Sequence, residues 1–116
     1  MATYTKIKLS ESLRGRGIRL STGATVIHNS PSGTTSWDEI WLWVTNNDTS
    51  NADEVLTIQW GDSAVDKNKI EENITISTGL KLVISGLILQ DSESVSGWGD
   101  NDSTALTIFG YVNRIT

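Results

Sequence analysis

The chain has no cysteine, one proline and one histidine among its 116 residues. Without cysteine there is no disulfide, no thiolate nucleophile and no cysteine-ligated zinc. The histidine, His28, ends an expected strand, and neither a G-x-S-x-G elbow nor a glycine-rich phosphate loop accompanies it. We therefore expect no catalytic residue, no metal site and no cofactor, and we interpret His28 as a structural or surface residue. A hydrolase that uses His28 is the weakest alternative.

Long apolar runs are also missing. No segment approaches the roughly 20 apolar residues of a membrane span. The first residues lack the apolar region of a signal peptide, so we expect synthesis in a host cytoplasm and no membrane partner. A chain of 116 residues is near the commonest domain size and is long enough to bury a core without disulfides.

Charge is distributed unevenly along the chain. The net charge of −5 divides into +4 over residues 1–20, where five basic residues stand against Glu11, and −9 over the rest, where four basic residues stand against thirteen acidic ones. The five basic residues are Lys6, Lys8, Arg14, Arg16 and Arg19. We predict a basic N-terminal arm over residues 1–20 and a β-domain over residues 21–116. Such an arm favours docking to an acidic surface, for instance on a neighbouring copy, although solvated charges would look the same. The acidic remainder disfavours nucleic acid.

Alternating apolar and polar residues dominate the rest of the sequence. Trp37–Thr45 and Glu54–Trp60 are the clearest strands, and we expect the polar loop between them to make them a hairpin. About eight or nine short strands recur at roughly 8–12 residue spacing, and no helical periodicity is evident. The fold class that this pattern predicts is all-β, an antiparallel β-sandwich of the jelly-roll kind with essentially no helix.

Tryptophan is concentrated in the Trp37–Gly61 region. Trp41 and Trp43 fall on the strand face opposite Ile40, Leu42 and Val44, because side chains alternate along a strand. Their rings could fill a core, lie in a contact between subunits, or stack on a sugar. Core or subunit contact is the preferred interpretation, because Glu39 and Thr45 offer few polar partners for a sugar.

The C-terminal half resembles small virion proteins of tailed bacteriophages. The resemblance rests on Gly79-Leu80, the run Gly86–Leu89 and the segment Leu106–Ile115, together with the Trp37–Gly61 region. It implies an all-β protein without enzymatic activity, located in the virion. Several such proteins are cement or decoration proteins, which bind the capsid surface as oligomers.

The sequence therefore predicts a non-enzymatic capsid cement or decoration protein that binds the major capsid protein and stabilises the shell. Neighbouring copies of itself, in a homotrimer or another homo-oligomer, are the second expected partner. The predicted contact residues are Lys6, Lys8, Arg14, Arg16, Arg19, Trp41 and Trp43. The alternative function is a carbohydrate-binding β-sandwich, for example a tail or fibre component that adheres to host glycans.

Overall fold

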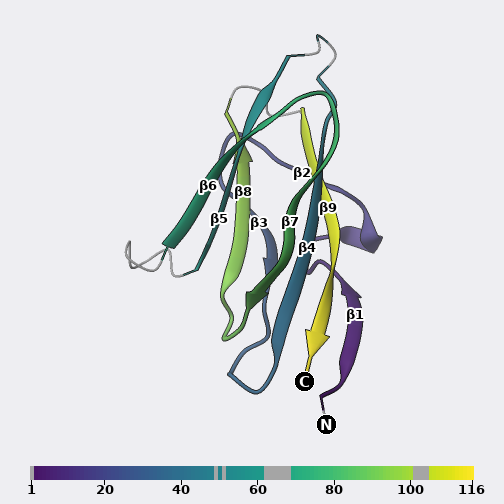
Figure 1. The fold of residues 1–116 in the computed structure, drawn as a ribbon, viewed down its shortest axis with the longest axis vertical. Coiled ribbons are helices and arrows are strands. Elements are labelled where there is room, and N and C mark those ends of the chain that lie inside the picture. Colours follow the sequence, from purple (N-terminus) through teal and green to yellow (C-terminus); the bar gives the residue numbers. More distant parts are fainter. Residues whose placement is uncertain (1, 49, 51, 62–68, 101–104) are drawn as a thin grey trace.

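Nine strands form two antiparallel sheets that face each other in the part of the chain that the structure describes (Figure 1). The computed structural model describes residues 2–48, 50, 52–61, 69–100 and 105–116, and only the backbone of residues 69–72. Among these residues the one helical segment is a 3-10 turn, η1 (Leu13–Gly15). The predicted all-β sandwich is confirmed.

Sheet A has five strands and sheet B has four. Sheet A has the order β1-β9-β4-β7, and β2 also pairs with β9; its strands are β1 (Tyr4–Lys8), β2 (Ile18–Arg19), β4 (Trp37–Asn46), β7 (Gly79–Leu89) and β9 (Leu106–Ile115). Sheet B has the order β3-β8-β5-β6; its strands are β3 (Thr25–Asn29), β5 (Glu54–Gly61), β6 (Lys69–Ile76) and β8 (Ser94–Gly99).

The pairing of the strands is nested. β2 pairs with β9, β3 with β8, β4 with β7, and β5 with β6, all antiparallel. The chain therefore behaves as one long hairpin whose successive strand pairs alternate between the two sheets. This is the arrangement of a double-sheet jelly roll, as the sequence predicts.

The core lies between the sheets, where their apolar faces meet. Ile40, Leu42 and Val44 of β4 are fully buried, and so are Leu56 and Ile58 of β5 in the opposite sheet. Alternate residues of β4 point outward and are half-buried, which is the period of two expected of a strand in a sandwich.

The predicted tryptophan hairpin is wrong in its pairing, although both strands exist. β4 pairs with β7 and β9 in sheet A, whereas β5 pairs with β6 and β8 in sheet B. The inner faces of both strands carry buried apolar side chains, and placing the two strands in opposite sheets brings these side chains into one core.

Residues 3–20 belong to the sandwich and do not extend from it as a separate arm. β1 pairs with residues 111–115 of β9, and β2 pairs with Thr107 and Ile108. Leu9 and Leu20 are fully buried in the core. The sequence prediction rested on the charges of this segment, whereas these two leucines and the strand pairing attach it to sheet A.

Two glycines shape sheet A. Gly86 has φ +86°, and the register of β4 and β7 shifts there, from Ile40 opposite Leu87 to Trp41 opposite Ser85. With this bulge, β7 continues as one strand from Gly79 to Leu89. Gly110 lies so close to β4 that a Cβ atom would collide with the carbonyl oxygen of Trp41.

Candidate functional site

The candidate site is the outward face of sheet A, which we call the sheet A face. It begins with Trp41 and Trp43 of β4, which point away from the buried row of Ile40, Leu42 and Val44 as predicted. Both rings are half-buried, so they do not belong to the core between the sheets.

β9 supplies two further rings to the sheet A face. Tyr111 lies opposite Trp41 and Phe109 opposite Trp43 in the β4–β9 register. The Trp41 and Tyr111 rings stack with centroids 6.3 Å apart and planes within 10°, and the Trp43 and Phe109 rings stack at 6.0 Å and 14°. Trp43 also contacts Tyr111 at 6.0 Å. The four rings therefore form one continuous cluster across two central strands.

Charged and polar side chains border the rings. The ammonium of Lys6, on β1, lies 4.4 Å from the centre of the Tyr111 ring and covers one face of it, a cation–π contact. Glu39 accepts hydrogen bonds from Trp41 Nε1 at 2.8 Å and from Asn113 Nδ2 at 3.1 Å. These two bonds lower the pKa of Glu39, so its carboxylate is charged beside the rings.

The two edge strands of sheet A expose large apolar side chains on the same face. Leu80, Leu82 and Ile88 of β7 are 64%, 44% and 51% exposed, and they lie opposite the outward residues Thr45, Trp43 and Glu39. Tyr4 of β1 is 71% exposed. Four of the six exposed large apolar residues in the described part of the chain are therefore on the edges of the sheet A face.

The structure divides the predicted basic residues into two groups. Lys6, Lys8 and Arg19 lie on the sheet A face, opposite Asn113, Tyr111 and Thr107 of β9. Arg14, which has φ 57°, and Arg16 lie in the exposed turn between β1 and β2. The structure thus brings Lys6, Lys8, Arg19, Trp41 and Trp43 together on one face and leaves Arg14 and Arg16 beside it.

Sequence reasoning missed Phe109 and Tyr111 as members of this site. Their alternation with Ile108 and Val112 was visible in the sequence, and it placed them on a strand face with Thr107 and Asn113. What the sequence does not show is that β9 pairs with β4, since the two strands are about 70 residues apart in the chain. The exposed apolar residues of β7 were missed for the same reason.

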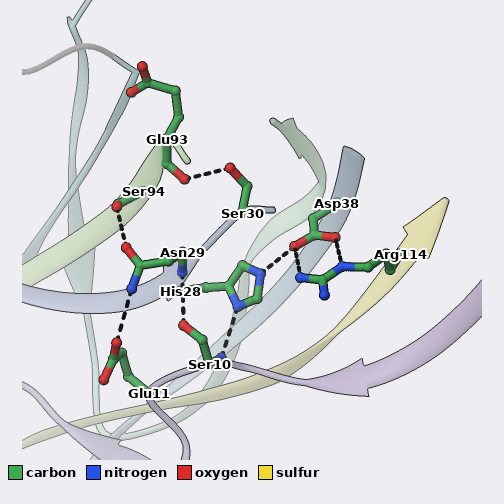
Figure 2. Close-up of polar contacts among 9 residues, drawn as sticks. All are labelled: Ser10, Glu11, His28, Asn29, Ser30, Asp38, Glu93, Ser94 and Arg114. Atoms are coloured by element: carbon green, nitrogen blue, oxygen red, sulfur yellow. Dashed lines mark hydrogen bonds and ion pairs between the residues drawn. The ribbon is translucent and has the colours of Figure 1, made fainter. Parts of the chain in front are cut away.

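A second group of polar side chains is buried, and it is centred on Asp38 (Figure 2). Asp38 is fully buried and accepts hydrogen bonds from Arg114 Nε at 2.8 Å, Arg114 Nη2 at 3.0 Å and His28 Nε2 at 2.6 Å. Burial raises the pKa of Asp38, but the bonds from Arg114 and His28 outweigh this effect, so its pKa lies below the usual value. The same contact with Asp38 raises the pKa of Arg114.

The position of His28 argues against its use in catalysis. The ring is 1% exposed, and its Nδ1 atom accepts a hydrogen bond from the backbone N–H of Ser10 at 2.9 Å. Nδ1 is therefore unprotonated and Nε2 carries the proton that is donated to Asp38, so neither nitrogen is free to accept a proton from a nucleophile. The Ser10 hydroxyl instead accepts from the backbone N–H of Asn29. His28, Asp38 and Ser10 form a structural connection between strands.

Metal and membrane sites are not evident in the described residues. No group of three or more histidine, cysteine, aspartate or glutamate side chains there could hold a metal ion. Asp100 accepts a hydrogen bond from the backbone N–H of Val55, and its neighbours Asn101 and Asp102 lie outside the described residues. Within those ranges no helix is long and apolar enough to span a membrane.

Comparisons with known proteins find little. No protein-family model matches the chain, and no curated protein matches it. A solved structure of the N-terminal part of endo-1,4-β-D-xylanase 10B from Clostridium thermocellum, its CBM22-1 and GH10 modules in complex with xylohexaose, aligns with a TM-score of 0.38 and 14% identity. The alignment covers 97% of this chain and 24% of the xylanase chain. Similarity at this level is too low to support an argument about function.

Proposed function

We propose that the protein is a non-catalytic assembly protein that binds another protein surface through the sheet A face. The observation that supports this most is the combination of four clustered rings on β4 and β9 with exposed aliphatic side chains on β7. An apolar centre rich in aromatic residues and bordered by charged side chains is typical of protein interfaces. Here Lys6, Lys8 and Arg19 provide the charged border.

The contacts of the rings favour a protein partner over a sugar. A sugar binds an aromatic platform by stacking on a ring face and by hydrogen bonding to polar groups beside it. One face of Tyr111 is already covered by Lys6, and the Trp41 N–H is already donated to Glu39. Leu80, Leu82 and Ile88 offer apolar area without hydrogen bonds, which suits apolar side chains of a partner.

The resemblance to virion proteins of tailed bacteriophages suggests what the partner is. On that basis the assembly is a capsid, the partner is the major capsid protein or a neighbouring copy, and the protein is a cement or decoration subunit. The jelly roll itself does not decide this, because viral capsid proteins and lectins both use it.

Co-sedimentation of the purified protein with capsid shells of its own virus tests the proposal. We expect saturable binding by the native protein and weaker binding by Leu82→Glu, which places a charge in the exposed apolar part of the sheet A face. The matched control is Val26→Glu, because Val26 is 40% exposed on β3 of the opposite sheet. The proposal is wrong if the native protein does not bind shells, or if both variants bind as well as it does.

A second candidate is carbohydrate binding on the sheet A face. It is favoured by Glu39 and Asn113, whose remaining oxygen atoms lie beside the rings of Trp41 and Tyr111. Saturable quenching of tryptophan fluorescence by an oligosaccharide, lost in Glu39→Gln and in Trp43→Ala but kept in Val26→Glu, would support it. Absence of quenching across a broad panel of glycans would contradict carbohydrate binding on the sheet A face.

A further inference from the structure

The outward face of sheet B contains a trough that no part of the proposed function uses. It encloses about 370 Å³ and lies along β5 and β8, on the opposite side of the sandwich from the sheet A face. The residues of its lining used below are Ala24, Gln59, Gly61, Glu93, Ser94 and Ser96.

The sequence of the strands explains why the sheet is hollowed there. Leu56 and Ile58 of β5 and Val95 of β8 are buried in the core, so Gln59, Ser94 and Ser96 point outward. On β8 the outward residues Ser94 and Ser96 are small, and Ala24 and Gly61 beside them are small as well. The longer side chains of Gln59 and Glu93 lie at the edge of the hollow that these small residues leave.

Two polar side chains in the trough have no hydrogen-bond partner among the described residues. Gln59 and Ser96 lie directly opposite each other in the β5–β8 register, and neither side chain hydrogen-bonds to any other described residue. Ser94 differs, since its hydroxyl donates to Asn29 Oδ1 at 2.6 Å (Figure 2). An amide and a hydroxyl that face the same hollow without partners are available to a ligand.

Glu93 adds a carboxylate whose backbone is held in place. Its carbonyl oxygen accepts hydrogen bonds from the Ser30 N–H at 3.0 Å and from the Ser30 hydroxyl at 2.8 Å (Figure 2). Among the described residues that line the trough there is no lysine, arginine or histidine. A phosphate, sulfate or carboxylate ligand would therefore meet the negative charge of Glu93 and no positive charge among these residues, so we expect neutral ligands to bind better than anions.

Trp98 lies beside the trough on β8 and is not part of its lining. It follows Ser96 by two residues on β8, so it points to the same side of sheet B, and it is half-exposed. An indole beside an amide, a hydroxyl and a carboxylate is suited to binding a sugar ring. The C–H face of the sugar packs on the indole, and the sugar hydroxyls donate hydrogen bonds to the carboxylate.

We propose that this trough is a binding site for a neutral mono- or disaccharide, in which Gln59, Glu93 and Ser96 hydrogen-bond sugar hydroxyls and Trp98 packs on the ring. The volume is at the small end of the range for ligand pockets, about 300–1,000 Å³, so a long polysaccharide is not expected to be enclosed. This site is independent of whatever covers the sheet A face.

Amide chemical shifts of the ¹⁵N-labelled full chain, titrated to millimolar concentrations with neutral hexoses, N-acetylhexosamines and their disaccharides, test the proposal. We expect saturable shifts at Gln59, Ser94, Ser96 and Trp98 for at least one of these sugars. The affinity should fall about 10-fold in Gln59→Ala and in Glu93→Gln, as expected for loss of a hydrogen bond to a ligand. Trp43→Ala, on the sheet A face, is the control and should leave the affinity unchanged. Glucuronic acid should bind more weakly than glucose.

Three results would overturn the proposal: no saturable shift for any sugar of the panel, shifts confined to the sheet A face, or affinities that Gln59→Ala and Glu93→Gln leave unchanged. If Gln59→Ala does not fold, Glu93→Gln alone decides, because the Glu93 backbone contacts remain possible with glutamine. Failure of this test would not affect the proposed assembly function, which co-sedimentation with shells tests separately.

Discussion

Arg114 on β9 lies directly opposite Asp38 on β4 and donates two hydrogen bonds to its carboxylate, one to each oxygen. Asp38 is fully buried, whereas the Arg114 side chain is 34% exposed. His28 of β3 donates to the same carboxylate from sheet B. The pair therefore connects two neighbouring strands of sheet A, and through His28 it connects the two sheets.

Removing the carboxylate should destabilise the fold. In Asp38→Ala the guanidinium of Arg114 and the Nε2 proton of His28 lose their acceptor inside the sandwich. We expect the free energy of unfolding to fall by about 2–4 kcal/mol, measured by urea denaturation. Asp53→Asn is the control, because Asp53 is exposed, and it should change stability little. If Asp38→Ala lowers the free energy of unfolding by no more than Asp53→Asn does, the Asp38 contacts do not stabilise the fold.

Stability should also depend on pH through Asp38. Its pKa is lowered in the folded state, so its contribution is fully present above the unfolded value of about 3.9 and is lost as the pH falls through the lower folded value. Below about pH 4, the free energy of unfolding of the native protein should therefore fall more steeply with decreasing pH than that of Asp38→Asn. Thermal melts of both proteins across this range measure the difference. If the melting temperatures of the two proteins change equally with pH, the lowered pKa of Asp38 is contradicted.

Gly110→Ala should be strongly destabilising. The new Cβ atom would collide with the backbone carbonyl of Trp41, and backbone cannot rotate away as a side chain can. We expect a loss of about 1–3 kcal/mol or more, because β4 and β9 must separate at the ring cluster. Gly23→Ala is the matched control, since its Cβ would meet only Ser21 Oγ at an ordinary 3.8 Å. Urea denaturation of the two variants compares them, and equal stability would refute the close approach.

The stacked rings should be energetically coupled. A double-mutant cycle with Trp43→Ala, Phe109→Ala and the double variant should give a coupling energy of about 0.5–1.5 kcal/mol for the pair at 6.0 Å. Trp43→Ala combined with Val26→Ala, in the opposite sheet, should give additive effects. Additivity of the Trp43 and Phe109 substitutions would mean that the rings are neighbours without a stabilising contact.

Binding to the assembly partner should depend on the edge of sheet A. Leu80→Glu and Leu82→Glu replace exposed side chains, so the fold should remain stable while affinity for shells falls about 10-fold or more. Lys6→Gln, Lys8→Gln and Arg19→Gln should mainly weaken binding at low salt, because exposed charges act over a screened distance. Binding isotherms at two salt concentrations separate the two effects. If Lys6→Gln, Lys8→Gln and Arg19→Gln lose the same affinity at both salt concentrations, these side chains do not act through their charge.

The sequence by itself determined the strands and the faces that they present. Alternation in Trp37–Thr45 correctly places Ile40, Leu42 and Val44 in the core and Trp41 and Trp43 outside it, because a strand permits only two directions for its side chains. The nearly continuous series of short apolar segments likewise predicts the all-β sandwich, and the jelly roll follows in the structure.

Only the tertiary structure decided which strands are neighbours. Phe109 and Tyr111 join Trp41 and Trp43 because β9 pairs with β4, and β4 and β5 separate into two sheets because each needs cover for a buried row. It likewise decided that residues 4–8 and Leu9 belong to the sandwich, and that Asp38 meets both Arg114 and His28. Local patterns record which way a side chain points, whereas strand pairing depends on the burial of both sheets at once, and no single segment contains that information.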